Sequence, residues 1–242
     1  MSITRLTFRP PAWATLLLLA ACALFASAGF WQLDRKAEKE DLFARFDRGA
    51  GVDPLSSLPT DAEAAAARYR PISLRGRYDP ERQVLLDNIV REGKTGYLVL
   101  TPLRTQNGVV MVNRGWLAAD AKRDRLPAVG VADNSREVRG LVDQFPQPGL
   151  RLAAESPQPE DPWPRRLLFP KSADIETHLG YAIAGYQVLL DPAAPDGFQR
   201  EWRPGVSGPN THLGYAVQWF AFAAAVTVIY VVLNLKKIRT SE

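Results

Sequence analysis

The chain has 242 residues, a formal net charge of +4 and one cysteine, Cys22. The charge is mild and forms no Lys/Arg cluster, which argues against a nucleic-acid partner. Because Cys22 lies in an apolar run, a disulfide, a CxxC redox motif and a thiolate metal site are excluded from the polar part of the chain.

The first predicted element is a membrane-spanning helix over residues 12–33, preceded by a short tail over residues 1–11. No charged residue occurs from Pro10 to Leu33. A helix needs about 20 apolar residues to cross roughly 30 Å of hydrocarbon, and this run is long enough. Trp13 and Trp31 lie near its two ends, where amphipathic rings favour the headgroup level.

Cleavage would remove this span, and two short motifs are compatible with it. Ala26-Ser27-Ala28 resembles a signal-peptidase site, and Leu19-Ala20-Ala21-Cys22 resembles a lipoprotein box. The apolar run continues past both motifs to Leu33, without the polar segment that normally follows a cleavage site. This favours an uncleaved anchor.

Residues 34–210 are expected to form one extramembrane domain rich in β-strands. The first helix is expected to continue through Asp34–Arg48, followed by a loop and a short helix over Ala62–Arg68. Asn107-Gly108 between two β-rich runs predicts a hairpin. A further helix is expected near Ala173–Tyr181, after a Pro-rich loop over Gly149–Pro164. Apolar alternation or apolar runs predict strands at Ile72–Tyr78, Val84–Val90, Gly96–Thr105, Val109–Trp116, Glu137–Phe145, Leu167–Phe169 and Tyr186–Leu190. The pattern indicates a mainly antiparallel β domain with minor helix, either a small barrel or a sandwich.

A second membrane span is expected over residues 211–235, followed by a basic tail over residues 236–242. No charge occurs from Pro204 to Leu235. A buried core helix is the alternative for both spans, but core helices seldom run this long without a charge. The sequence therefore indicates an α+β membrane protein, with one helix at each end of the chain.

Flanking charges predict that both termini lie inside and the large domain outside. The second span is followed by Lys236, Lys237 and Arg239 and preceded by only Arg200 and Arg203. Positive charges flanking a span usually stay in the cytoplasm. The charges around the first span point the other way, but long loops translocate largely regardless of charge.

The chemistry-bearing residues offer little to an enzyme. The two histidines are His178 and His212. Neither a Ser-His-Asp triad nor a three-histidine zinc site can be assembled, and no glycine-rich phosphate loop occurs. We therefore expect a protein that is not an enzyme.

His212 at the start of the second span is the most informative residue. Tyr215, Trp219 and Phe222 follow it on one helical face. An imidazole beside an aromatic stripe is suited to a haem, with the nitrogen on iron and the rings over the porphyrin. The alternative is an interfacial histidine above a stripe that packs against the first span. Antiparallel spans would bring Gly29–Lys36 level with Asn210–Phe220.

An ordered set of motifs resembles the Surfeit locus protein 1 family of cytochrome c oxidase assembly factors. Together they cover nearly the whole chain. They are G-x-W-Q-L-x-R-K at Gly29–Lys36, Gly76–Pro80, Leu86–Asn88, Gly96-Tyr97, Thr101–Leu103, Val112–Trp116 and N-x-H-L-x-Y-A-x-x-W-F at Asn210–Phe220.

The resemblance implies a bacterial inner-membrane protein that assists maturation of haem-copper oxidase. The implied partners are oxidase subunit I, haem A synthase and membrane lipid, and the implied cofactor is transiently bound haem A. The histidine of the closing motif, here His212, is implied as the iron ligand. A structural partner of the oxidase that binds no haem is the alternative, and an unrelated membrane-anchored scaffold is a third.

The other candidate binding residues come from the same motifs. Tyr215 and Trp219 would cover the porphyrin. Trp31 and Gln32 would line the same site or anchor the interface. Arg114 would pair with a propionate, because guanidinium matches carboxylate geometry. Trp116 would face haem or oxidase, and the alternative for Asn113–Trp116 is a strand end with a tight turn.

Overall fold

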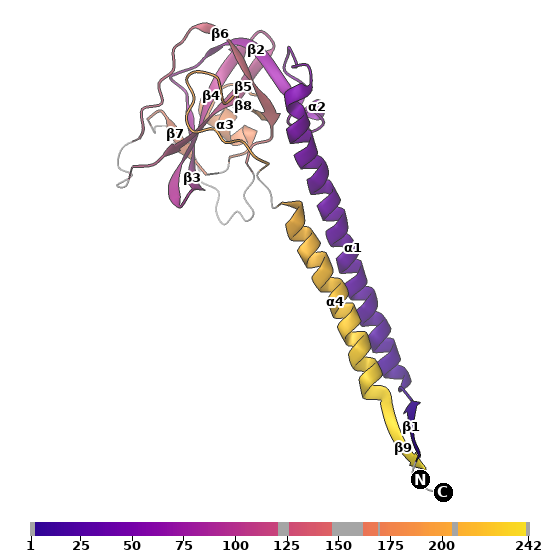
Figure 1. Ribbon diagram of the computed structural model, residues 1–242. Coiled ribbons are helices and arrows are strands. Elements are labelled where there is room, and N and C mark those ends of the chain that lie inside the picture. The colour runs from indigo at the N-terminus through magenta and orange to yellow at the C-terminus, as the bar shows by residue number, and fades with distance from the viewer. Residues whose placement is uncertain (1–2, 121–125, 147–161, 169, 205–207, 241–242) are drawn as a thin grey trace. The chain divides into compact units, whose positions relative to one another are not determined.

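The computed structural model describes residues 3–120, 126–146, 162–168, 170–204 and 208–240. The chain forms two compact units. One combines Met1–Phe43 with Val206–Glu242, and the other is Ala44–Gly205. The first is helical, and the second is mainly β-structure (Figure 1).

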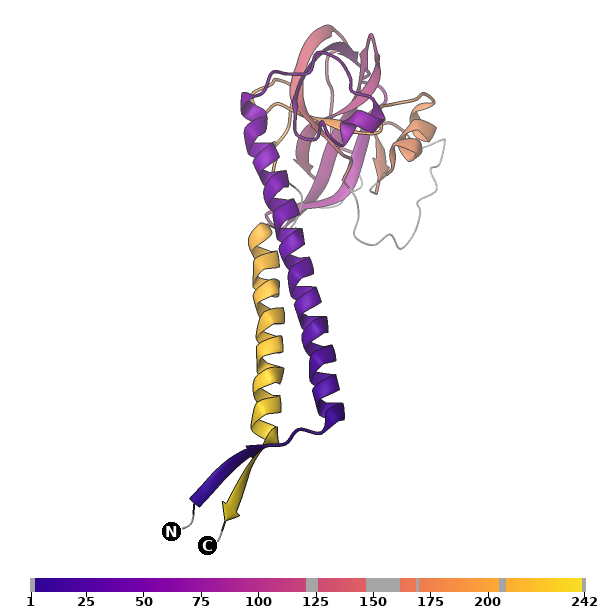
Figure 2. The same cartoon turned by 90° about the vertical axis from the view of Figure 1, so that its right-hand side faces the viewer.

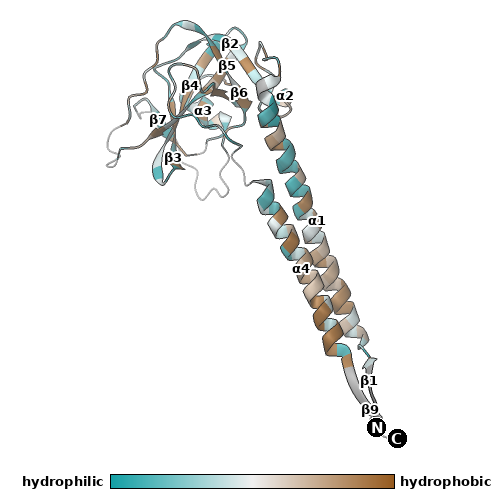
Figure 3. Ribbon diagram, viewed as in Figure 1, coloured by the Kyte–Doolittle hydropathy of each residue, from teal (hydrophilic) through white to brown (hydrophobic). Residues whose placement is uncertain are grey.

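Two long apolar helices, α1 (Ala12–Arg48) and α4 (Pro209–Asn234), dominate the helical unit. Both are long and apolar enough to cross a membrane. Only 6% of the most apolar stretch of each is buried, which argues against the core helix of a soluble protein. Figure 3 shows that the apolar residues of α1 lie towards its N-terminus, and that polar residues follow towards Arg48. The expected continuation through Asp34–Arg48 is confirmed as one unbroken helix.

The helices pack side by side and antiparallel through small and aromatic residues (Figures 1 and 2). Gly29 and Ala216 are buried. A Cβ on Gly29 would lie 2.7 Å from Cζ of Phe220, so only glycine permits this approach. Nearer the termini, Thr15 and Tyr230 share a hydrogen bond of 2.6 Å. Contacting positions on α1 recur at spacings of seven, three, four and three residues, which places them on one helical face: Thr15, Cys22, Phe25, Gly29 and Gln32.

The two terminal tails pair with each other, which the sequence did not predict. Strand β1 (Ile3–Phe8) runs antiparallel to β9 (Leu235–Thr240), with Phe8 opposite Leu235. Because α1 and α4 are antiparallel, the segments beyond their outer ends run alongside one another. Neither six-residue segment has a strong β pattern, and so each looked like a simple tail.

The β unit is a small closed barrel, one of the two architectures expected. Strands β2, β6, β8, β5 and β4 pair in that order, and a β2–β4 pairing closes the ring. Strands β3 and β7 extend the sheet from β4. All pairings are antiparallel except β3–β7 and β5–β8. The strand bounds are β2 Pro71–Tyr78, β3 Val84–Arg91, β4 Lys94–Thr105, β5 Gly108–Ala118, β6 Ser135–Asp143, β7 Arg165–Leu167 and β8 Gln187–Leu190.

Alternation along these strands builds a core on each side of the sheet. One cluster comes from the five ring strands and includes Leu74, Val112 and Val188. A second cluster packs β3, β4 and β5 against α3 (Ser172–Leu179) through Leu86, Leu100 and Ile175. Each side chain of this kind contributes about 1.5–3 kcal/mol when fully buried. The barrel is thus a packed body, not a hollow one.

The expected hairpin joins β4 to β5, with a turn that differs in detail. Thr105 pairs with Gly108, so Gln106 and Asn107 form the loop. Among Gln106, Asn107 and Gly108, only Gly108 has a positive φ, at 131°. The Thr105 hydroxyl accepts from the Asn107 amide at 3.2 Å and donates to the Gly108 carbonyl at 2.8 Å. These bonds hold the turn.

The remaining local predictions hold with shifted bounds, and β7 shares only Leu167 with the strand expected at Leu167–Phe169. The helix expected over Ala62–Arg68 is α2 (Asp61–Ala64), capped by a reciprocal Thr60–Glu63 box and followed by turns. A short 3₁₀ helix, Gly49–Gly51, opens the expected loop after α1. Phe169 and most of the expected Pro-rich loop lie outside the described residues.

Candidate functional site

His212 and Gln32, two residues singled out from separate motifs, are in direct contact in the helical unit. His212 lies in the first turn of α4, after Pro209. Its Nδ1 is 2.8 Å from Oε1 of Gln32 on α1, and both side chains are only half-buried. The antiparallel pairing of α1 and α4 therefore places the two end motifs together, as the sequence predicted.

This hydrogen bond determines which imidazole nitrogen is available. The amide oxygen of Gln32 can only accept, so Nδ1–H of His212 is the donor. In the neutral ring the lone pair is then on Nε2. A histidine whose other nitrogen donates to a fixed acceptor is the usual arrangement of a metal-ligating imidazole. The contact thus gives His212 one oriented donor atom.

The two aromatic residues expected to cover a porphyrin differ in their surroundings: Trp219 packs against α1, and Tyr215 is exposed. Trp219 stacks on Phe25 of α1 with ring centroids 5.9 Å apart, and Phe222 contacts both rings. Packing against the first span, the alternative reading, therefore accounts for Trp219. Tyr215 is 51% exposed, which leaves it available to a ligand or to lipid.

Trp31 is next to Gln32 and is 55% exposed. The guanidinium of Arg35 lies 6.0 Å from its ring, one helical turn further along α1. Arg35 also pairs with Glu38 at 2.8 Å. The apolar part of α1 therefore ends at Leu33, just after Trp31 and Gln32, and charged side chains begin at Asp34.

Arg114 lies inside the barrel and not on a surface. It is 2% exposed. Its guanidinium donates to the carbonyls of Asp196 at 2.7 Å, Val129 at 2.7 Å and Gly130 at 3.1 Å. Gln83 Oε1 accepts a further bond at 3.0 Å. With its donors bound to internal acceptors, Arg114 is placed as a structural residue, and this geometry does not support pairing with a propionate.

Burial sets the electrostatics around Arg114. It lowers the pKa of the Arg114 guanidinium, and Tyr78 and Asp196 act in the opposite direction. It also raises the pKa of Tyr78 to about 12. A buried guanidinium held by carbonyl oxygens is costly to remove, because those oxygens would lose their donors. Sequence reasoning missed Gln83, and it named Thr101 only as part of the Thr101–Leu103 motif without a role; the Thr101 hydroxyl donates to Gln83 Oε1.

Trp116 is also part of the core. It is 7% exposed, and its indole donates to the carbonyl of Ile89 at 2.9 Å. Its ring packs so closely on Gly96 that a Cβ there would lie 2.5 Å from it. Gly115 has φ of 111°, which only glycine adopts without strain. The Val112–Trp116 motif thus has a structural reason at each of these positions.

His178, the other histidine of the chain, lies at the end of a helix in the barrel unit. It lies in the last turn of α3 and is buried, with Nδ1 3.0 Å from Nη1 of Arg165. Within the described part of the chain, no group of three or more His, Cys, Asp or Glu side chains could hold a metal ion.

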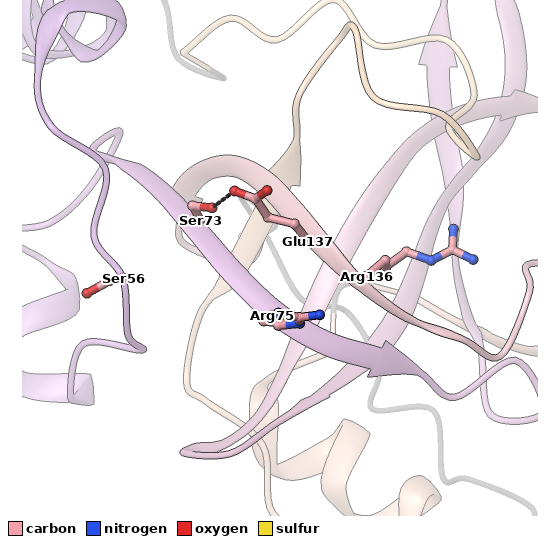
Figure 4. Close-up of a pocket in the computed structure, with 5 residues that line it drawn as sticks. All are labelled: Ser56, Ser73, Arg75, Arg136 and Glu137. Atoms are coloured by element: carbon pink, nitrogen blue, oxygen red, sulfur yellow. Dashed lines mark hydrogen bonds between the residues drawn. The ribbon is translucent and has the colours of Figure 1, made fainter.

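A polar pocket of about 400 Å³ on β2 and β6 offers no competing site (Figure 4). Ser73 donates to Glu137 at 2.6 Å, so these two groups satisfy each other. The guanidinium of Arg136 points away from them and bonds Asp196 and Asn134.

Comparison with known proteins identifies the family. A model of the SURF1 family matches residues 19–224. The chain belongs to the SURF1 family. It is 27% identical to a SURF1-like protein of Rickettsia felis, over 90% of this chain and 95% of that protein. It is 26% identical to a SURF1-like protein of Drosophila melanogaster, over 95% of this chain and 79% of that protein. It is 25% identical to Surfeit locus protein 1 of Takifugu rubripes, over 92% of this chain and 97% of that protein.

The SURF1-family match confirms the resemblance expected from the motifs. It begins within α1 and ends within α4, so it includes Gln32 and His212 as well as the barrel. Most of each apolar helix therefore lies within the range that the family model matches. The matched range includes both residues of the contact between Gln32 and His212.

Proposed function

We propose that this SURF1-family chain is an assembly factor for haem-copper oxidase, which binds haem A transiently at His212 and passes it to subunit I. The observation that carries the proposal is the hydrogen bond from His212 Nδ1 to Gln32 Oε1. It orients the ring and leaves Nε2 as the donor for iron.

The residues present fit a haem at this position. The porphyrin would supply most of the ligands that haem iron needs, so His212 alone would suffice to hold the group. Tyr215 and Trp31 are exposed aromatic residues in the motifs that carry His212 and Gln32. When bound, haem A would supply the redox-active iron. The role of the chain is to hold the group, orient it and release it.

The proposed setting is a bacterial inner membrane, with α1 and α4 as spans. Both termini would be cytoplasmic and the barrel periplasmic. Two helices of suitable length and low burial support the spans. The basic residues after α4 support the orientation. Haem A synthase would donate the haem to this chain, and subunit I would accept it. Neither the receipt nor the delivery of haem requires an enzyme activity of this chain.

The direct test is a haem spectrum of the full-length chain purified after co-expression with haem A synthesis. The wild-type chain is expected to show a haem A spectrum, and His212→Ala is expected to lose it. His178→Ala is the matched control, because it removes the other histidine of the chain, which lies in the barrel unit. An equal haem content in His212→Ala would remove the ligand assignment.

A second function is a structural partner of the oxidase that binds no haem. The packing of Trp219 on Phe25 and the internal bonding of Arg114 favour it, because both residues were candidates for haem contact. This function predicts that the chain copurifies with subunit I equally well in the wild type and in His212→Ala. It also predicts a wild-type chain without a haem spectrum.

A further inference from the structure

Arg35 follows Gln32 by three residues on α1, on the flank of the helix pair where His212 lies. Residues three or four apart share one side of a helix. Gln32 contacts His212 on this flank, and seven residues earlier Phe25 stacks on Trp219. Arg35 continues the row of Phe25 and Gln32, about 4.5 Å further along the axis than Gln32. A cation therefore follows directly on the contact that orients the imidazole.

Arg35 lies at the level where the helix pair ends. α4 begins at Pro209, three residues before His212, whereas α1 continues well beyond Gln32. Figure 3 shows that α1 becomes hydrophilic next to the start of α4. An amphipathic group bound at His212 would therefore have apolar surface towards one side and charged side chains towards the other.

The guanidinium of Arg35 is only partly satisfied by the chain itself. Its Nη2 lies 2.8 Å from Oε1 of Glu38, and the two side chains are 42% and 53% exposed. An ion pair this exposed contributes little to stability, so a second carboxylate can compete for it. Arg35 Nε is shielded from solvent and has no acceptor among the described residues. A shielded donor without an acceptor favours the binding of a carboxylate oxygen.

The neighbouring cation, Lys36, is less suited to this role. Its amino group is held at 2.6 Å by Glu40, one turn further from His212. Arg35 instead reaches back along the helix, with its guanidinium 6.0 Å from the Trp31 ring. A guanidinium also presents paired donors that match a carboxylate, whereas an ammonium acts as a point charge.

We propose that Arg35 binds a propionate of the haem held at His212, and so selects porphyrins with free carboxylates. This inference rests on the proposed function, because it requires a haem at His212. A haem carries its propionates along one edge, and arginine binds a carboxylate through paired, charge-assisted hydrogen bonds. The apolar part of the ring would be left to the exposed Trp31 and Tyr215. Arg35 takes the role that the motifs suggested for Arg114, which is bonded inside the barrel.

The test compares haemin with haemin dimethyl ester as ligands of the purified full-length chain. Esterification neutralises the propionates and leaves the iron and the ring intact. Arg35→Gln is expected to weaken binding of haemin by about fivefold, the contribution of a half-exposed ion pair. Its affinity for the ester should equal that of the wild type. Absorbance titration of each chain with each ligand measures both.

The matched control is Lys36→Gln, which removes the same charge at the next position and should leave both affinities unchanged. An equal loss of haemin affinity in Lys36→Gln would show general attraction by positive charge and overturn the assignment to Arg35. Glu38→Gln removes the competing carboxylate and should strengthen binding of haemin but not of the ester. An unchanged haemin affinity in Glu38→Gln would contradict the competition.

His212→Ala separates this inference from the proposed function. It should weaken binding of haemin and of the ester alike, because it removes the iron ligand. Suppose that binding depends on His212 but Arg35→Gln weakens both ligands equally, or neither. The haem site would then stand, and the propionate contact would be overturned. A wild-type chain that binds neither ligand would overturn both.

Discussion

The Nδ1–H of His212 donates to Oε1 of Gln32 across the α1–α4 pair, at 2.8 Å. The two residues are far apart in the chain and come from the two motifs at its ends. Their contact orients the imidazole and assigns the lone pair to Nε2. Gln32 is therefore a positioning residue, whose effect on a ligand is exerted through His212.

Substitution of Gln32 is expected to separate positioning from packing. Gln32→Leu keeps the side-chain size but removes the acceptor, so the ring loses its preferred tautomer and orientation. Haem affinity should fall by about 10–100-fold, the usual effect of losing such a partner. Gln32→Glu retains an acceptor and should keep affinity close to that of the wild type. Titration of haem into the purified full-length variants measures both.

A different outcome would assign Gln32 to the packing of the helices alone. In that case Gln32→Leu and Gln32→Glu would lower the midpoint of thermal unfolding without any difference in haem affinity between them. Rescue by glutamate but not by leucine is the signature of the hydrogen bond, because only glutamate can accept from Nδ1.

Gly29 is expected to control the approach of the two helices. Any Cβ at this position would lie 2.7 Å from the Phe220 ring, inside van der Waals contact. Gly29→Ala should therefore lower the thermal midpoint of the full-length chain in detergent, at a cost of about 1–3 kcal/mol. Phe220→Leu should partly restore stability when combined with Gly29→Ala. A double-mutant cycle with no coupling between the two sites would contradict this packing.

The spans, the strands and the contact between the end motifs could be predicted from sequence for simple physical reasons. Uncharged runs of this length have few alternatives to a membrane helix. Alternation marked β2, and Asn107-Gly108 marked the β4–β5 hairpin. Closure of the barrel could not be predicted, because it depends on β2 pairing with both β4 and β6, and sequence shows no pairing partners.

The candidate site was predicted only in part. Gln32 and His212 were expected to be level, since antiparallel helices bring the end of one beside the start of the other. The burial of Arg114 and Trp116 was missed, because a motif does not reveal whether its residues face inwards. Arg114 follows Val110 and Val112 with period two on β5, which in hindsight is the signal for an inward side chain.

Arg114→Lys is expected to destabilise the barrel strongly. A lysine cannot donate to the carbonyls of Asp196, Val129 and Gly130 at once, so buried acceptors would be left unpaired. The free energy of unfolding should fall by about 2–4 kcal/mol in urea, as followed by near-UV circular dichroism. Arg75→Lys, at an exposed position, should change it by less than about 0.5 kcal/mol. If Arg114→Lys instead kept its stability and lost haem, the propionate role would be restored.

Asp79 is expected to make the stability of the barrel depend on pH. Burial alone would raise its pKa, but hydrogen bonds from Arg104 at 2.8 Å and Tyr181 at 3.0 Å outweigh burial and hold the pKa below the ordinary 3.8. A carboxylate with a depressed folded pKa stabilises the fold above its unfolded pKa. That contribution is lost as the pH falls from about 4 through the folded pKa.

Asp79→Asn should therefore lower the free energy of unfolding by roughly 1 kcal/mol at pH 7 and by much less at pH 3. Tyr181→Phe removes one of the two donors, so its pH dependence should lie between those of the wild type and Asp79→Asn. The measurement is urea unfolding of each chain at a series of pH values between 3 and 7. A difference between wild type and Asp79→Asn that stays constant over this range would show that the carboxylate charge contributes nothing. Since Arg104 and Tyr181 reach Asp79 from β4 and from the segment after α3, a pH-dependent difference would also establish that these segments are held together by charge.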